Sequence, residues 1–399
     1  MNEQQAPDVT LSCSPPRRLR EGHGWIFSNE LAHAGGELPG VGALVAVRDQ
    51  AGELVASGLF HPHSLIAVRV LASRRLVALD AAFFSERLER ARDLRERLFP
   101  GQTCYRLCYG ESDGLPGLLI DRYGEHFVLQ TTCAGMDQRL DAIAEVLERL
   151  FAPASIIESN DSPLRELEGL PPRHRALLGA PPDEITVRLD DVEHIVQLAQ
   201  SQKTGLFLDQ RRNYRLLAAH AQGRRVLDGF CYQGGFALAA AVAGAASVVG
   251  IDSSQPALER AAKSAVRNGV ADRCRFRKAD LFRALAELRR SEERFDLIIL
   301  DPPSFTRSKR HVPEAKRAYR ELNTNALRFL RPGGILATAS CSHHIHPDTF
   351  HEMLLASAAS AGRNVRVLAW EGQSPDHPVL LGMPETQYLK FALLEVVAF

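Results

Sequence analysis

Residues 226–236 read Val-Leu-Asp-Gly-Phe-Cys-Tyr-Gln-Gly-Gly-Phe, an apolar strand that enters a turn containing glycine and continues into an alanine-rich helix. Glycine lets a backbone approach a ligand closely, because it carries no Cβ. The turn lacks the Gly-x-Gly-x-x-Gly spacing of dinucleotide-binding proteins and the Gly-Lys-Ser/Thr of a P-loop. The stretch therefore predicts a ligand site at the end of a strand, and it disfavours both a dinucleotide pyrophosphate and nucleoside triphosphate hydrolysis.

From this stretch onward, strand and helix signals alternate along the chain. This pattern is typical of a doubly wound α/β sheet with parallel strands. Ligands of such sheets lie beyond the carboxyl ends of the strands, near the point where the strand order reverses. The last strand signal, 388–396, has no helix signal beside it, so this strand could run antiparallel to the others. The remaining signals are strands at 225–228, 247–252, 275–278, 295–300 and 334–340, and helices at 235–242, 255–268, 281–289 and 315–329.

Acidic residues end the next two strands after the turn. Asp252 follows the apolar segment 248–251, and Asp280 follows the segment 276–279. A carboxylate at the first position can accept hydrogen bonds from both hydroxyls of a ribose, and one at the second can accept from the exocyclic amine of adenine. Each aspartate could instead cap the helix that follows it. Taken together with the turn and with Asp228, the two carboxylates predict an adenosine-containing ligand.

The length of the chain, 399 residues, is enough for two or three domains. We predict the divisions 1–75, 76–190 and 191–399. Short β segments in the first part favour a small β-barrel. The second part predicts a compact α+β domain with a proline-rich loop at 169–182. The signals in these two parts are strands at 42–47, 54–60, 65–70, 117–120 and 127–132, and helices at 81–98 and 136–150.

Composition excludes several classes of protein. The 48 basic and 48 acidic residues give a net charge of +0, so any nucleic-acid site must be concentrated in a local patch. The 7 cysteines are an odd number in a chain that opens without an apolar signal segment, which disfavours a disulfide framework. No apolar run reaches the roughly 18 residues of a membrane span, and no Cys/His cluster has metal-ligand spacing. We expect a cytoplasmic protein with no membrane partner and no metal.

Six motifs are spread over the chain: Gly24-Trp25-Ile26-Phe27-Ser28, 110–117, 202–211, 228–235, Asp301-Pro302-Pro303-Ser304-Phe305 and Ser340-Cys341-Ser342. With them the chain resembles, over nearly its whole length, the bacterial large ribosomal subunit RNA methyltransferase I family, which is class I, S-adenosylmethionine-dependent and forms 5-methylcytosine. The resemblance implies a Rossmann-like class I methyltransferase domain preceded by a PUA RNA-binding domain and a central α+β domain. These agree with the divisions predicted above.

The resemblance implies S-adenosylmethionine as the cofactor. Asp252 would bind its ribose and Asp280 its adenine, while Asp301 and Pro302 would lie beside the transferred methyl group. The segment 204–209 would fold over the cofactor as a lid, although it could equally be a loop leading into the next helix. The implied cofactor-binding residues are Thr204, Phe207, Asp209, Asp228, Phe230, Tyr232, Gly234, Gly235, Asp252, Asp280, Asp301 and Pro302.

Two loops give different accounts of the chemistry. In many methyltransferases a loop such as Asp301-Pro302-Pro303-Ser304-Phe305 holds an exocyclic amine while its aromatic ring stacks on a flipped base. Alone, this loop predicts N2-methylation of guanine or N6-methylation of adenine. The next strand ends at Cys341, and a thiolate there could add to C6 of a cytosine and make C5 nucleophilic. Spacing alone leaves Cys341 as a small buried residue; the resemblance makes it the nucleophile, with Asp301 or a water as the base.

Candidate RNA contacts lie in both halves of the chain. Arg307, Lys309 and Arg310 follow the Asp301 loop in a basic cluster, which could hold phosphates or could be a solvated helix face. Arg18 and Trp25 offer guanidinium and aromatic surfaces, although Trp25 could equally belong to the core of the barrel.

The leading hypothesis is methylation of C5 of a cytosine in 23S ribosomal RNA, free or in a large-subunit assembly intermediate, through a Cys341–C6 adduct. The resemblance also allows a homodimer. One alternative is the N2-guanine or N6-adenine methyltransferase, and another is a non-catalytic RNA-binding or ribosome-assembly factor.

Overall fold

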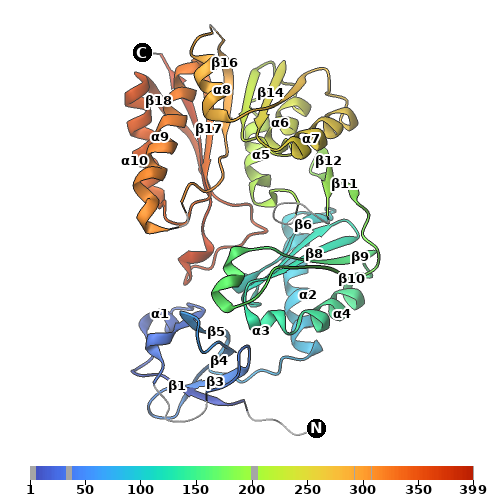
Figure 1. Ribbon diagram of the computed structural model, residues 1–399, viewed down its shortest axis with the longest axis vertical. Helices are drawn as coiled ribbons and strands as arrows, with labels where there is room; N and C mark the ends of the chain where they lie inside the picture. The colour runs from blue at the N-terminus through green and yellow to red at the C-terminus, as the bar shows by residue number, and fades with distance from the viewer. Residues whose placement is uncertain (1–5, 33–37, 199–204, 292, 307, 399) are drawn as a thin grey trace. The chain divides into compact units, whose positions relative to one another are not determined.

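The computed structural model describes residues 6–32, 38–198, 205–291, 293–306 and 308–398 (Figure 1). Two predicted site residues, Thr204 and Arg307, lie outside the described residues. The chain divides into two compact units: the first runs to Ile185 and also contains the later segment Asp376–Thr386, and the second begins at Thr186. Within the described part of the chain, no helix combines the length and the apolar character needed to cross a membrane.

The first unit begins with a β-sheet whose strand order is β1-β3-β4-β5-β2. Its elements are β1 (Asp8–Thr10), α1 (Arg17–Arg20), β2 (Trp25–Phe27), β3 (Leu44–Arg48), β4 (Leu54–Phe60) and β5 (Ile66–Ser73). β1 runs parallel to β3, and the other neighbours are antiparallel. Val45, Val47 and Val68 point into its core and are fully buried. The β segments predicted for this region are confirmed.

The second sheet of this unit has the strand order β10-β9-β8-β7-β6. Its elements are α2 (Ala81–Leu98), β6 (Cys104–Tyr109), β7 (Leu118–Tyr123), β8 (His126–Thr131), α3 (Ala134–Asp137), α4 (Leu140–Phe151), β9 (Ser155–Asn160) and β10 (Arg173–Leu178). The helix expected at 81–98 is confirmed, and it begins where the Asp80 carboxylate accepts a hydrogen bond from the Phe83 amide. The loop expected at 169–182 is wrong in part, because β10 pairs with β9 there. Flanking prolines are compatible with such an edge strand.

The segment Asp376–Thr386 lies late in the chain but packs within the first unit. Arg95 of α2 is 0% exposed; it donates to the Asp376 carbonyl over 2.7 Å and forms an ion pair with Asp113. The amide of Arg106 donates to the Asp376 carboxylate over 3.0 Å. The first unit is therefore completed by residues from near the end of the chain.

The second unit is built on a sheet whose strand order is β15-β14-β13-β16-β17-β19-β18. The hairpin β11 (Glu184–Leu189) and β12 (Val192–Gln197) comes before it in the chain. Strands β13 to β17 run parallel, and β19 is antiparallel to both β17 and β18. The elements are α5 (Arg211–Ala218), β13 (Arg225–Gly229), α6 (Gly235–Val242), β14 (Ser247–Asp252), α7 (Gln255–Arg267), β15 (Cys274–Lys278), α8 (Leu281–Leu288), β16 (Phe295–Leu300), α9 (Val312–Phe329), β17 (Leu330–Ser340), α10 (Pro347–Ala361), β18 (Asn364–Glu371) and β19 (Lys390–Val397).

The doubly wound sheet predicted from the alternating pattern is confirmed, including its antiparallel last strand. β13 has β14 on one side and β16 on the other, so the strand order reverses there. Helices α8, α9 and α10 pack on one face of the sheet, whereas α5, α6 and α7 lie on the opposite face (Figure 1). The prediction missed α5, α10 and β18. Helix α10 has a run of only Ala and Ser at 356–361, and β18 is an edge strand with mostly exposed side chains, so neither of these two has a strong apolar period.

Candidate functional site

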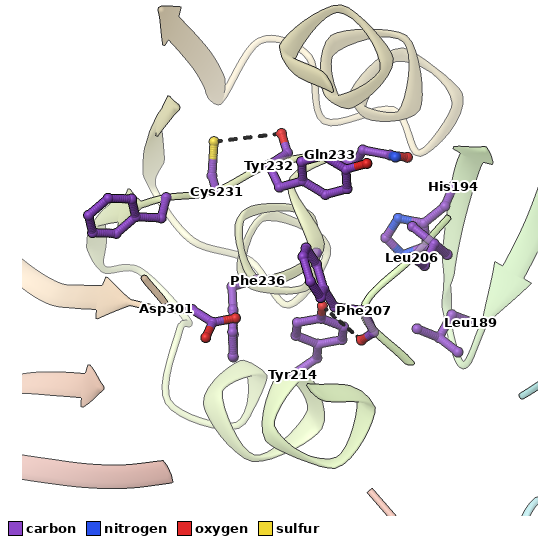
Figure 2. A pocket seen from close by; sticks show the side chains of 12 residues that line it. Leu189, His194, Leu206, Phe207, Tyr214, Cys231, Tyr232, Gln233, Phe236 and Asp301 are labelled. Carbon is purple, nitrogen blue, oxygen red and sulfur yellow. Dashed lines mark hydrogen bonds between the residues drawn. The ribbon is translucent and has the colours of Figure 1, made fainter. Parts of the chain in front are cut away.

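A pocket lies in the second unit where the strand order reverses, at the carboxyl ends of β13 and β16 (Figure 2). It is walled by aromatic rings on several sides, and the Asp301 carboxylate reaches it from the end of β16. This is the position that the sheet topology predicts for a ligand. The lining residues are Leu189, His194, Leu206, Phe207, Tyr214, Phe230, Cys231, Tyr232, Gln233, Gly235, Phe236 and Asp301.

The turn between β13 and α6 has an unusual backbone. Phe230, Tyr232 and Gly234 all have positive φ, at 65°, 48° and 79°. Two of these are not glycine, and such backbone strain concentrates at ligand-binding sites. At Gly235, an added Cβ would stand 2.5 Å from the Tyr214 hydroxyl oxygen, so no side chain fits there without displacing that ring. Gly235 therefore contributes only backbone to the pocket, whereas Phe230, Cys231, Tyr232 and Gln233 of the same turn line it with side chains.

Asp228, at the end of β13, is almost fully buried beneath this turn. Its Oδ2 accepts a hydrogen bond from the Ala237 amide over 2.9 Å, whereas its Oδ1 has no hydrogen-bond partner among the described residues. Burial raises the pKa of Asp228 well above its usual range, and the nearby Asp301 and Asp252 raise it further. A positively charged ligand would relieve this repulsion between carboxyl groups.

The carboxylates of Asp252 and Asp280 occupy different settings. Asp252 is half-buried; one oxygen accepts from the Tyr232 amide over 2.9 Å and the other from the Ser254 amide over 2.8 Å. It therefore fixes the shape of the turn, and the ribose contact predicted for it stays a prediction. Asp280 is exposed and accepts from the Arg283 amide over 3.0 Å, so it does cap α8, which was the alternative raised from the sequence. The adenine contact predicted for it stays a prediction.

The described part of the predicted lid, Gly205 to Asp209, has two kinds of residue. Phe207 lines the pocket, with its ring centroid 5.2 Å from that of Tyr232. Its carbonyl accepts a hydrogen bond from the Tyr214 hydroxyl over 3.2 Å (Figure 2). Asp209 is buried, does not line the pocket, and accepts from the Tyr388 hydroxyl over 2.5 Å. Phe207 is therefore part of the pocket wall and Asp209 anchors this segment, while the role of the segment as a lid stays a prediction.

The loops that carry Asp301 and Cys341 are joined by hydroxyl groups. They leave the neighbouring parallel strands β16 and β17 at the same edge of the sheet. Ser304 Oγ and Ser342 Oγ are 2.9 Å apart, and Ser342 Oγ lies 3.1 Å from the Tyr319 hydroxyl of α9. Burial above all, together with Cys341 and Asp301 nearby, raises the pKa of Tyr319 to about 12. The partly exposed Cys341 thus sits between buried serines that are tied to both α9 and the Asp301 loop.

Cys231, the competing thiol near the turn, is buried, and its pKa is raised well above the ordinary value, mainly by burial. This setting suits a packing residue rather than a nucleophile, because the thiolate is the reactive form.

The predicted RNA contacts are of three kinds. Phe305 is half-buried and packs against Tyr319, with ring centroids 4.8 Å apart, so its ring is part of an aromatic cluster. Lys309 and Arg310 are exposed in a short 3-10 helix after the Asp301 loop. In the first unit, Arg18 pairs with Glu30 over 2.6 Å, and the Trp25 indole donates to Glu111 over 2.9 Å. Arg18 and Trp25 therefore already have structural partners.

Sequence reasoning missed three residues near the pocket and the Cys341 loop: Tyr319, His194 and Lys390. Tyr319 and His194 fall within ordinary amphipathic patterns that carry no signal of their own. Lys390 did carry one, because lysine is rare in this arginine-rich chain and here stands at the start of an apolar strand.

His194 gives a prediction for stability against pH. It is 2% exposed, its Nδ1 has no hydrogen-bond partner within the described residues, and burial lowers its pKa to about 4. The unfolded chain binds this proton near pH 6.5, so protonation favours unfolding and stability falls as the pH drops from about 6.5 through 4. The free energy of unfolding, measured with urea, should fall between pH 7 and pH 4.5 in both proteins. The fall should be about 2 kcal/mol smaller in His194→Phe than in the wild type. Equal losses in both proteins would contradict the prediction.

Comparison with known proteins agrees with this geometry. A model of the S-adenosylmethionine-dependent methyltransferase family matches residues 139–381, and a PUA-like domain model matches residues 9–73. The ribosomal RNA large subunit methyltransferase I of Photobacterium profundum is 39% identical over 378 residues, which are 94% of this chain and 95% of that protein. The protein of the same name from Alteromonas mediterranea is 36% identical over 97% of this chain and 98% of its own length.

A solved structure has the same fold. It is a candidate S-adenosylmethionine-dependent methyltransferase from Streptococcus mutans, which superposes with a TM-score of 0.83 over 98% of this chain and 100% of that chain. The two sequences are 20% identical, so this likeness concerns the fold alone.

Proposed function

Because the chain belongs to the ribosomal RNA large subunit methyltransferase I family of S-adenosylmethionine-dependent methyltransferases, we propose that it methylates C5 of a cytosine in 23S ribosomal RNA. Methylation proceeds through a covalent bond between Cys341 and C6 of that base. The observation that carries the proposal is the hydrogen-bonded junction of Ser304, Ser342 and Tyr319, which holds the Cys341 loop against the Asp301 loop beside the pocket.

The residues around the pocket suit S-adenosylmethionine. The turn offers backbone with no room for a side chain at Gly235, and Asp228 keeps a buried oxygen without a partner among the described residues. The repulsion that Asp252 and Asp301 exert on Asp228 favours a ligand with positive charges, and this cofactor carries them on its sulfonium and ammonium groups. When bound, it supplies an electrophilic methyl group.

The chain's residues then have distinct parts in the reaction. The Cys341 thiolate adds to C6 and forms an S–C6 bond, and the electron pair of the C5–C6 double bond makes C5 nucleophilic. C5 would then take up the methyl group that the cofactor supplies, and the electron pair of the broken methyl–sulfur bond would stay with the cofactor. Asp301 accepts the C5 proton, the double bond reforms, and the thiolate leaves. A water molecule held near Asp301 is the other candidate for this base.

A second candidate function is N2-methylation of guanine or N6-methylation of adenine. It is favoured by the Asp301 side chain, which lines the pocket where an exocyclic amine could donate to it. An amine is itself a nucleophile, so Cys341 would have no part in that reaction.

RNA contacts complete the proposal. The exposed Lys309 and Arg310 suit phosphate contacts, which position a strand without reading its sequence, and Arg307 belongs to the same cluster by sequence. Arg18 and Trp25 would contribute from the PUA-like part. The division at 75/76 and 190/191, the homodimer, the assembly intermediate as substrate and the cytoplasmic location stay predictions.

The identity of the methylated nucleoside tests the proposal. The protein is incubated with methyl-labelled S-adenosylmethionine and large-subunit RNA that lacks the modification, and the RNA is digested for nucleoside mass spectrometry. We expect labelled 5-methylcytidine, and no uptake into RNA that already carries the modification. Labelled methylguanosine or methyladenosine would establish the second candidate instead. RNA binding without methyl transfer would point to an assembly factor.

A further inference from the structure

A lysine is buried beside the Cys341 loop. Lys390 is the first residue of β19 and is 5% exposed. In the antiparallel pairing of β17 with β19 it lies opposite Ser340, the residue before Cys341. A side chain that carries a charge is almost never buried unless a partner compensates it, so its contacts indicate what it is there to do.

The ammonium group of Lys390 has two close acceptors. Its Nζ donates to the Ser342 carbonyl over 2.7 Å and to the Tyr388 carbonyl over 2.7 Å. Lys390 thus binds the residue after Cys341 and pairs with the residue before it. An ammonium group has three donors, and two neutral carbonyls use two of them without neutralising its charge.

The other titratable groups near Cys341 come from every neighbouring element. Asp301 stands at the end of β16, Tyr319 on α9, and His343 and His344 follow Cys341 in its own loop. Lys390 and His344 both lower the pKa of His343, after the larger effect of burial, so His343 supplies no fixed charge at neutral pH. Tyr319 is held neutral by its raised pKa. Of the described groups named here, Lys390 is therefore the buried cation beside the Cys341 loop.

Burial lowers the pKa of Lys390 to about 8, and the neighbouring Cys341 opposes this shift. Most Lys390 side chains are therefore charged at neutral pH. At that pH their positive charge can stabilise a neighbouring thiolate.

We propose that Lys390 is a positioning residue whose buried ammonium group stabilises the thiolate form of Cys341 and fixes the backbone on either side of it. The inference rests on the proposed function for its purpose, since a thiolate is what adds to C6. The effect of the lysine charge on the thiol does not depend on the reaction, because a cation near a thiol favours the thiolate whether or not RNA is bound. The thiol proton passes to solvent.

The test measures the titration of Cys341 without RNA or cofactor. The folded protein is treated with iodoacetamide over a range of pH, and alkylation of the Cys341 peptide is followed by mass spectrometry. Lys390→Gln keeps donors but removes the charge, and Lys390→Arg keeps the charge. We expect Lys390→Gln to raise the midpoint of the pH dependence of Cys341 alkylation by about one pH unit, which slows alkylation about tenfold at pH 7. In Lys390→Arg this midpoint should stay near that of the wild type.

The buried Cys231 and Cys108 report on folding in the same experiment, because both stay unreactive while the fold is intact. An unchanged midpoint in folded Lys390→Gln would overturn the inference. So would an equal rise in Lys390→Arg, since the effect would then come from packing rather than charge. A shifted midpoint in Lys390→Gln together with full methylation by Cys341→Ala would instead remove the proposed function and leave this inference standing.

Discussion

Replacing Cys341 by alanine should lower the rate of methyl transfer at least about 10³-fold, the size of loss typical when a covalent nucleophile is removed. In the proposed reaction the thiolate supplies the bond that makes C5 of cytosine reactive, so a variant without the thiol lacks the step on which methyl transfer depends. Affinity for S-adenosylmethionine should change by less than about twofold, because the proposed partner of the thiol is C6 of the base rather than the cofactor. The rate is measured with labelled cofactor, and the affinity by calorimetry.

Cys274→Ala is the matched control. Cys274 lies on β15 of the same sheet, and burial raises its pKa to about 11, so its removal should leave methylation unchanged. RNA containing 5-fluorocytidine gives a second readout, because fluorine cannot leave from C5 as a proton does. The wild type should then form a complex with the RNA that survives denaturation, and Cys341→Ala should not. A variant with near-normal activity would show that Cys341 only packs.

Replacing Asp252 by alanine should weaken S-adenosylmethionine binding about 100-fold. Hydrogen bonds to a charged group are each worth about 1.5–3 kcal/mol, and the substitution removes the acceptors proposed for the ribose hydroxyls. It also breaks the hydrogen bonds that the Tyr232 and Ser254 amides donate to this carboxylate, so the backbone of the turn is no longer held in its conformation. Asp252→Asn keeps one acceptor oxygen, so its affinity for S-adenosylmethionine should fall only about tenfold. Both values come from calorimetric titration with the cofactor.

Asp272→Ala provides the comparison for this prediction. Asp272 is another carboxylate of the same sheet, just before β15, with its side chain 77% exposed. Its removal should leave cofactor affinity unchanged. If Asp252→Ala bound as tightly as Asp272→Ala while keeping the wild-type melting temperature, the ribose contact assigned to Asp252 would be wrong.

The features that could be predicted from the sequence are local. The turn after β13, the alternation of strands and helices, and the carboxylates of Asp228, Asp252 and Asp280 each occupy a short stretch whose pattern is visible without the rest of the chain. The parallel sheet then brings these stretches together, because its strands all end at one edge. Predicting the sheet was therefore enough to predict where the pocket lies.

The contacts around Cys341 could not be predicted in the same way. Tyr319, Ser342 and Lys390 meet across α9, the β17 loop and β19, and no sequence period links positions so far apart. Phe305 illustrates a different difficulty. Its motif predicts a ring that stacks on a base, yet in the structure the ring packs against Tyr319, and an aromatic residue has the same sequence signature in both settings.

The segment Asp376–Thr386 has a consequence for synthesis of the protein. The N-terminus of a chain emerges from the ribosome first, and domains generally fold as they emerge. The first unit cannot finish folding before the second is synthesised. Arg95 and Arg106 form hydrogen bonds with Asp376, and Asp376 is translated after nearly all of the second unit. A fragment ending at Ile185 would leave the buried Arg95 without one of its acceptors. The two units are thus expected to mature together, near the end of translation.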